Sequence, residues 1–181
     1  NVISVMDAQT VYSRVSEWAL KYDPAFYEII TSDPERTKEI LNIDREGAKP
    51  RKDIAKWNEV KDYISYFYGE LYAPDYTLPE NINAQDAKAI IQKYAEVYSL
   101  DDDKDTWFAK IKDMCEPLGF TPNVKEYKKN PGAFKGHVGD VSTVIRIALT
   151  SRKNTPDLYS IMKILGDEVI KGRLADACER I

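Results

Sequence analysis

The chain has 181 residues, of which 43% are apolar and 31% are charged, and its formal net charge is −4. This length is enough for one large or two small domains with a real core, and no segment approaches the roughly 20 consecutive apolar residues of a membrane span. We therefore expect a soluble protein without membrane association.

Three short helices are predicted at the start of the chain. Asp7 is suited to cap the first helix, and the pair Asp23-Pro24 is expected to end it. Asp23 and Asp33 are each followed by proline, and both then begin a new helix, since aspartate caps a helix and proline fits its first turn. Residues 42–50 lack periodicity and predict a loop.

The longest helix is expected from residue 52 to about residue 72. One apolar stripe indicates it, formed by Ile54, Trp57, Val60, Ile64, Phe67 and Leu71. Several cations lie off this stripe, namely Arg51, Lys52 and Lys56, and they are candidates for binding phosphate. Tyr63 and Tyr66 also lie off it, where they would either stack on unpaired bases or pack against a neighbouring subdomain.

A boundary is predicted at residues 73–81, which contain two prolines, so we expect one helical subdomain at 1–75 and a second at 80–181. Asn83 is suited to cap the helix that follows. The run Asp101-Asp102-Asp103 lacks the spacing of a calcium loop and is better explained as the capped start of another helix. No alternating strand pattern is found, so the expected fold class is all-α with two packed helical subdomains.

A cationic, loop-rich insertion is expected between Thr121 and Gly139. Residues 123–153 contain seven Lys or Arg and two acidic residues, so this segment has a net charge of +5. Residues 49–61 have a net charge of +3. Charge segregated in this way suits a one-sided polyanion contact, although an ordinary solvated surface is the alternative. His137, the only histidine, is either an RNA contact or an exposed loop residue.

The stretch from Arg146 to Leu158 joins a helix end, a basic turn and a new helix start. Upstream, an apolar face comprises Val141, Val144, Ile145, Ala148 and Leu149, and Arg146 is expected on the opposite, solvent-facing side with Ser142 and Thr150. Thr155 is suited to cap the next helix and Pro156 to begin it. Residues 152–154 are then expected to form an exposed cationic corner.

This stretch resembles the C-terminal anticodon-binding domain of bacterial glutamyl-tRNA synthetases. The family pattern is roughly Leu-Arg-x-Ala-Leu-Thr-Gly-Arg, then Pro, a helix ending Leu-Gly-x-Glu, and Arg followed by Ile or Leu. The matching positions are Arg146, Ala148, Leu149, Thr150, Arg152, Pro156, Leu165, Gly166, Glu168, Arg173 and Leu174. Ser151 replaces the usual Gly, and Val144-Ile145 replaces the usual Pro-Leu.

The resemblance implies a helical anticodon-binding bundle of the class I synthetase type, from an enzyme that attaches glutamate to tRNA with ATP and magnesium. It implies that a monomer binds tRNA through the anticodon loop and arm. The candidate tRNA-binding residues are Arg146, Arg152, Lys153, Arg51, Lys52, Lys56, Lys128, Lys129, Lys135 and His137. The same domain of a glutaminyl- or class I lysyl-tRNA synthetase is an alternative, as is a helical protein-interaction module.

No catalytic residue, metal or cofactor is expected within this chain. The His-x-Gly-His motif and the lysine-rich loop of class I synthetases are absent, and one histidine excludes a two-histidine metal motif. Cys115 and Cys178 fall among apolar helical residues, which favours a reducing compartment such as the cytoplasm over a disulfide framework. Because Asn1 stands where an initiator Met would, we expect a fragment of a longer protein.

Overall fold

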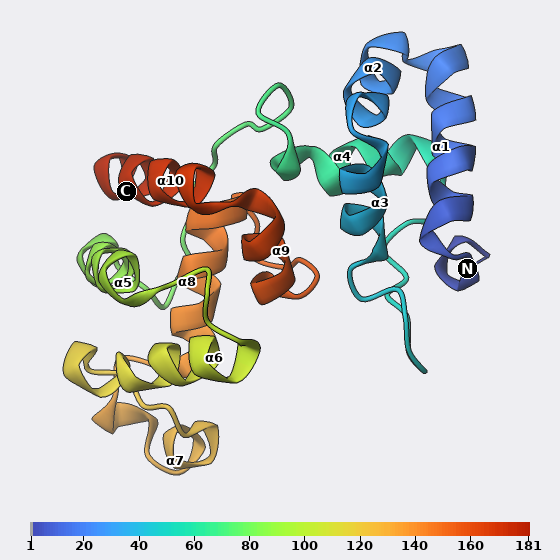
Figure 1. Ribbon diagram of the computed structural model, residues 1–181. Coiled ribbons are helices and arrows are strands. Elements are labelled where there is room, and N and C mark those ends of the chain that lie inside the picture. Colours follow the sequence, from blue (N-terminus) through green and yellow to red (C-terminus); the bar gives the residue numbers. More distant parts are fainter. Residues whose placement is uncertain (1) are drawn as a thin grey trace. The chain divides into compact units, whose positions relative to one another are not determined.

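The computed structural model describes residues 2–181 and confirms the all-α class (Figure 1). The α-helices are α1 (Ala8–Tyr22), α2 (Pro24–Ser32), α3 (Pro34–Asn42), α4 (Val60–Ile64), α5 (Ala84–Val97), α6 (Lys104–Asp113), α7 (Val124–Lys129), α8 (Val138–Thr150), α9 (Leu158–Leu165) and α10 (Asp167–Arg180). Within residues 2–181 there is no strand, only an isolated bridge between Thr121 and His137. None of the helices in this range is long and apolar enough to cross a membrane.

The chain forms two compact units. The first consists of the chain up to Ala73 together with Pro156–Ile164, and the second consists of Pro74–Thr155 together with Leu165–Ile181. The backbone therefore passes between the units three times, and α9 belongs to the first unit although it follows most of the second in sequence.

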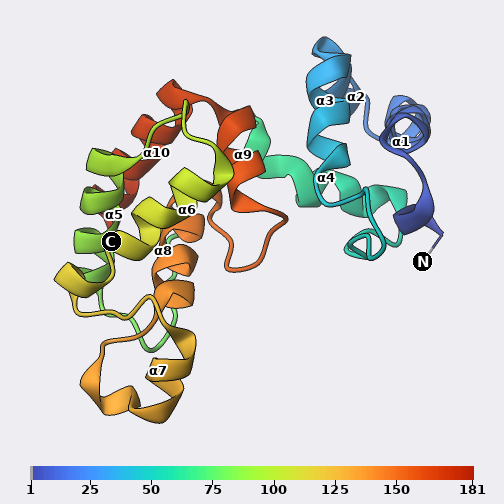
Figure 2. The ribbon, with the colours of Figure 1, turned by 60° about the horizontal axis from the view of Figure 1, so that its bottom comes forward.

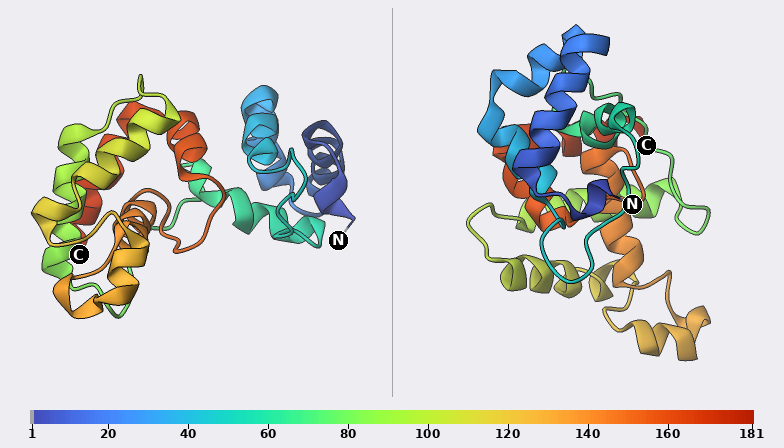
Figure 3. Two further views of the ribbon diagram at one scale, coloured as in Figure 1. Left: turned by 90° about the horizontal axis from the view of Figure 1, so that it is seen from below. Right: turned by 90° about the vertical axis from the view of Figure 1, so that its right-hand side faces the viewer.

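In the first unit α1, α2 and α3 pack against one another (Figure 3). The carboxylates of Asp7, Asp23 and Asp33 accept backbone N–H groups of the first turns at 2.7, 3.1 and 3.1 Å, which confirms the three predicted caps. The residues buried between these helices include Val11, Val15, Phe26, Ile30 and Leu41. Local capping and a small shared core thus account for the three helices at the start of the chain.

The long helix predicted from residue 52 is wrong. That region contains only the 3₁₀ helix η2 (Trp57–Glu59), the five-residue α4 and the 3₁₀ helix η3 (Ser65–Phe67). The carboxylate of Glu59 accepts from the backbone N–H groups of Ala55 and Lys56 at 2.7 and 3.1 Å, which starts the helical segment late. Ile54 and Phe67 are buried nonetheless. Burial alone therefore produced the periodic stripe, and α1 is the longest helix of the described residues.

In the second unit α8 is the central helix, since α5, α6 and α10 all contact it. Eight of its 13 residues are buried, so its neighbours cover more than one face. Across this core the indole Nε1 of Trp107 donates to the hydroxyl of Tyr94 at 3.0 Å, and burial raises the pKa of Tyr94 to about 12. Three neighbouring helices thus enclose α8.

The predicted starts of α5 and α6 are confirmed. Asn83 accepts from a backbone N–H of the first turn of α5 at 2.8 Å, and Asp103 does the same for α6 at 2.7 Å. Gly119 has a φ of 86° in the turn after the 3₁₀ helix η4 (Glu116–Leu118), as a left-handed glycine requires. The aspartate run therefore serves capping.

The insertion at 121–139 is more regular than predicted, because it contains α7 and the 3₁₀ helix η5 (Pro131–Ala133). Asn123 caps α7 by accepting two backbone N–H groups at 3.0 and 3.2 Å. The Tyr127 ring lies 5.2 Å from the ring of His137, centroid to centroid, which docks α7 beyond the N-terminal end of α8 (Figure 2).

Candidate nucleic-acid interface

Helix α8 ends in a left-handed turn at Ser151. This residue has a φ of 60° and a ψ of 26°, a conformation that glycine adopts at lower cost than other residues. Its N–H donates to the carbonyl of Ile147 at 2.8 Å, and its hydroxyl accepts from the backbone N–H of Asp75 at 2.9 Å. The serine thus keeps the geometry of the glycine in the family pattern and adds an anchor for the segment that begins the second unit.

Arg146 closes the loop that follows α8. Its guanidinium donates to the hydroxyl of Thr155 and, at 3.4 Å, to the carbonyl oxygen of Thr155. The prediction that Arg146 and Thr150 share an open solvent face is wrong, because the surrounding helices leave Arg146 half-buried and Thr150 only 1% exposed. We call residues 146–155 the corner, since this contact joins its two ends.

Two further expectations are wrong, namely that Thr155 caps α9 and that Pro156 begins it. The hydroxyl of Thr155 accepts from Arg146 and does not cap α9. Instead Asp157 accepts from the backbone N–H and the hydroxyl of Ser160 at 3.0 and 2.7 Å, and α9 begins at Leu158, two residues after Pro156.

The expectation that residues 152–154 form an exposed cationic turn is confirmed only in part. Lys153 and Asn154 are exposed, whereas Arg152 is half-buried and its N–H donates to the hydroxyl of Thr150 at 3.2 Å. A carboxylate that the sequence did not single out lies near them. Hydrogen bonds from Thr77 lower the pKa of Asp75, and the charge of Lys153 lowers it further. The corner is thus cationic, with one acid at its edge.

Arg173 contacts the backbone of the corner, a structural role that the sequence analysis did not predict. It is 8% exposed, and its guanidinium donates to the carbonyl of Leu149 at 2.6 Å. An unpaired carbonyl in the last turn of a helix is thereby satisfied. The sequence carried a signal, since Arg173 belongs to the matched pattern, but spacing alone did not indicate its partner.

The other candidates of the second unit lie at the opposite end of α8. A helix of 13 residues is about 20 Å long, so Lys128, Lys129, Lys135 and His137 are separated from the corner by roughly that distance. Lys128 and Lys129 are exposed on α7, whereas Lys135 pairs with Asp86 at 2.6 Å. The structure therefore does not bring these four residues to the corner.

His137 is not the exposed loop residue that one reading predicted. It is half-buried and caps α8, with its Nδ1 accepting from the N–H of Gly139 at 2.9 Å. Its own N–H donates to the carboxylate of Asp140 at 2.8 Å, which completes a reciprocal cap.

The candidates of the first unit differ in exposure. Lys52 and Lys56 are exposed, but Arg51 is half-buried and pairs with Asp53 at 2.5 Å. Burial alone would lower the pKa of Arg51, yet its hydrogen bond to Asp53 and the charge of that residue raise it. Tyr63 donates to the same carboxylate at 3.4 Å. Arg51 is thus already engaged in a local cluster.

Base stacking and packing against a neighbouring subdomain were the two alternatives for Tyr63 and Tyr66, and burial argues against stacking by Tyr66. Tyr66 is 2% exposed and packs on Phe67 with 4.7 Å between ring centroids, so it presents no face to a ligand. Tyr63 is half-buried, and burial, with the nearby charge of Asp53, raises its pKa to about 12.

Neither a metal site nor a reactive thiol stands out. Residues 2–181 contain no group of three or more His, Cys, Asp or Glu arranged to hold a metal ion. Cys115 is buried, and desolvation raises the pKa of its thiol to about 11, so little nucleophilic thiolate is present near neutral pH.

Comparison with known proteins finds one matching domain model and several similar sequences. Residues 126–178 match the model of an anticodon binding domain. The chain is 46% identical over 178 residues to a glutamate–tRNA ligase of Clostridium perfringens (strain 13 / Type A), covering 96% of this chain and 33% of that protein. It is 37% identical to the glutamate–tRNA ligase of Acetivibrio thermocellus over 96% of this chain and 32% of the relative. The chain is 36% identical to the glutamate–tRNA ligase of Sorangium cellulosum, over 96% of this chain and 31% of the relative. The chain thus spans about a third of the length of these relatives.

Proposed function

Since this chain is homologous to the C-terminal, anticodon-binding region of bacterial glutamate–tRNA ligases, we propose that it binds the anticodon loop and arm of a glutamate tRNA. We assign aminoacylation, with its glutamate, ATP and magnesium, to the part of the parent enzyme that this chain does not match. The absence of both class I signature motifs from the sequence supports that division. We further propose that the domain acts as a monomer in the cytoplasm.

One observation carries the proposal. The stretch that matches the anticodon-binding model, residues 126–178, contains the whole corner as well as Arg173, which supports it. The corner combines three cations, Arg146, Arg152 and Lys153, on the end of a helix that is packed on several sides. The bases of an unpaired RNA loop can stack on the guanidinium planes of arginines presented in this way.

The side chains of the corner suit different parts of this task. A guanidinium is planar, binds phosphate through two N–H groups and stacks on a base, whereas an ammonium acts as a point charge. Because Thr155 holds the guanidinium of Arg146, that side chain loses less freedom when it binds RNA. We assign base recognition to Arg146 and phosphate contacts to Arg152 and Lys153.

The test measures the affinity of the chain for a glutamate tRNA transcript and for the same transcript with an altered anticodon, from 50 to 200 mM salt. Arg152→Ala and Lys153→Ala should weaken both RNAs alike and each reduce the slope of log affinity against log salt by about 0.7 to 0.9. Lys171→Ala removes the same charge from an exposed position on α10 and serves as the matched control.

Arg146→Ala should instead lower affinity for the cognate anticodon by roughly 1 to 3 kcal/mol and affect the altered anticodon less, by analogy with base discrimination in DNA. Equal affinity of the wild-type chain for the two transcripts would contradict anticodon recognition. If the corner variants behave like Lys171→Ala while the wild type still discriminates, Lys52 and Lys56 become the next candidates.

A further inference from the structure

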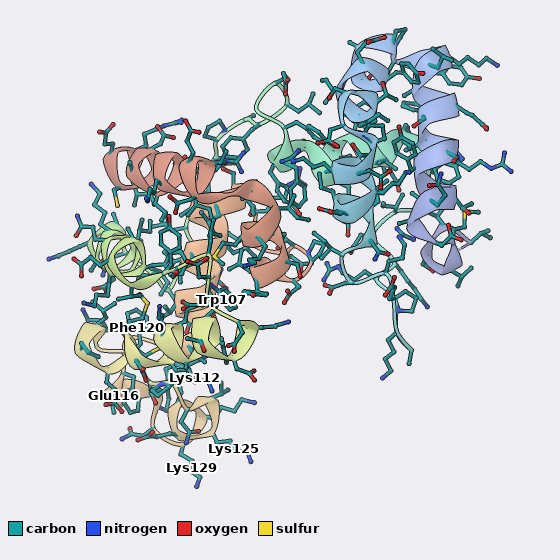
Figure 4. The ribbon with its side chains drawn as sticks, in the orientation of Figure 1. Trp107, Lys112, Glu116, Phe120, Lys125 and Lys129 are labelled. Atoms are coloured by element: carbon teal, nitrogen blue, oxygen red, sulfur yellow. The ribbon has the colours of Figure 1, made fainter. Side chains whose placement is uncertain are left out.

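Helix α7 carries three lysines that have no structural role. Lys125, Lys128 and Lys129 lie three and four residues apart, so they share one face, and like charges at this spacing destabilise a helix. α7 buries none of its six residues, and Figure 4 shows Lys125 and Lys129 pointing outward from its tip. The cluster therefore costs the fold some stability without contributing to the core.

Four other lysines of the second unit are paired with carboxylates. Lys93 contacts Glu96, Lys110 contacts Asp102, Lys135 contacts Asp86 and Lys171 contacts Asp167, at 3.1, 2.6, 2.6 and 2.7 Å. For none of the three α7 lysines does the side-chain ammonium have an ion-pair or hydrogen-bond partner within residues 2–181.

Glu126 is the one acidic residue on α7, and its carboxylate contacts a residue outside the helix. The carboxylate of Glu126 accepts from the hydroxyl of Thr121 at 3.3 Å, and Thr121 is buried, so this contact draws Glu126 toward the body of the unit. Tyr127 holds the same helix against His137, the residue that caps α8. α7 is thus docked on one side and presents an uncompensated charge of +3 on another.

We propose that Lys125, Lys128 and Lys129 form a second RNA contact that binds phosphates of the same tRNA, away from the bases that the corner recognises. This inference rests on the proposed function. The two cationic groups lie at opposite ends of α8, about 20 Å apart, and one folded RNA arm is long enough to reach both. Lysine favours phosphate contacts, which fix the position and register of a nucleic acid, over base readout.

The experiment compares two triple variants of the chain that lose the same charge. Lys125→Gln, Lys128→Gln and Lys129→Gln are combined in one, and Lys88→Gln, Lys93→Gln and Lys171→Gln, on α5 and α10, are combined in the control. Affinity for the glutamate tRNA transcript and its altered-anticodon form is measured from 50 to 200 mM salt. Far-UV circular dichroism verifies that both variants keep the wild-type helicity.

The α7 variant should reduce the salt slope by about 2 to 3, since each phosphate contact contributes 0.7 to 0.9, and the loss should be equal for both transcripts. The control variant should reduce the slope by less than about 1. Equal slopes for the two triple variants, or a loss confined to the cognate anticodon, would overturn the inference.

The corner variants in the same assay separate the two proposals. If Arg152→Ala and Lys153→Ala weaken tRNA binding while the α7 variant matches its control, only the second contact is refuted, and an acidic protein partner becomes the alternative occupant of α7. If the wild-type chain binds neither transcript, the proposed function fails and the α7 contact fails with it.

Discussion

The bond between Arg146 and Thr155 makes a stability prediction that can be tested with a double-mutant cycle. Arg146→Gln removes the guanidinium, Thr155→Val removes the hydroxyl that accepts from it at nearly constant volume, and the double variant completes the cycle. Urea unfolding of all four proteins gives the coupling free energy between the two side chains.

The expected coupling free energy follows from the exposure of Arg146 and from the number of hydrogen bonds that join it to Thr155. A hydrogen bond from a charged donor contributes about 1.5 to 3 kcal/mol, and half-burial of Arg146 places this one near the lower end. The longer bond to the Thr155 carbonyl, at 3.4 Å, survives in Thr155→Val and reduces the coupling further. We therefore expect a coupling of about 1 kcal/mol and a larger loss, about 1.5 to 2.5 kcal/mol, for Arg146→Gln alone.

The same variants report on RNA recognition. Thr155→Val keeps the charge of Arg146 but releases its orientation, so affinity for the cognate anticodon should fall several-fold while the salt slope stays unchanged. A coupling below about 0.5 kcal/mol, the usual error of additivity, together with unchanged affinity, would show that this contact neither closes the corner nor orients Arg146.

Three further predictions follow from single residues. Ser151→Ala should destabilise the chain by about 1 kcal/mol in urea because it loses the bond to Asp75 and keeps the left-handed backbone, whereas Ser151→Gly should be close to neutral because relief at φ 60° offsets the lost bond. A colorimetric thiol assay at pH 8 should label Cys178 before Cys115, whose buried thiol has a pKa of about 11 and should react only on unfolding. Backbone and side-chain hydrogen bonds in the first turn of α6 lower the pKa of Asp103, so its stabilising effect is present above its ordinary value of 3.8 and is lost as pH falls through the lowered value. The difference in urea midpoint between wild type and Asp103→Ala should therefore shrink in acid.

The helix starts were predictable because their determinants are local. Asp7, Asp23, Asp33, Asn83 and Asp103 each accept a backbone N–H three residues ahead, an interaction that the sequence alone specifies. The all-α class followed from the same signals. The resemblance found in the sequence agrees with the match of residues 126–178 to an anticodon binding domain.

The failures arose where tertiary contacts override local pattern. Thr155 has the chemistry of a cap, but the guanidinium of Arg146 takes its hydroxyl. Thr150 was placed opposite an apolar stripe, yet it is buried, because α8 is contacted by three other helices. The stripe from Ile54 to Phe67 identified buried residues and overestimated the helix, because extended and 3₁₀ backbone can bury the same side chains.

The position of α9 has a consequence for synthesis of the protein on the ribosome. The first unit is completed only by Pro156–Ile164, so it cannot finish folding when Ala73 emerges. At the usual elongation rates of about 5 to 20 residues per second, the missing segment arrives roughly 5 to 20 s later. During that interval the early helices lack a part of their native surroundings, and incompletely packed chains of this kind are prone to aggregate. For the same reason, a gene truncated after Ala73 encodes an incomplete unit, and a fusion that supplies Pro156–Ile164 through a short linker is needed to obtain the whole unit on its own.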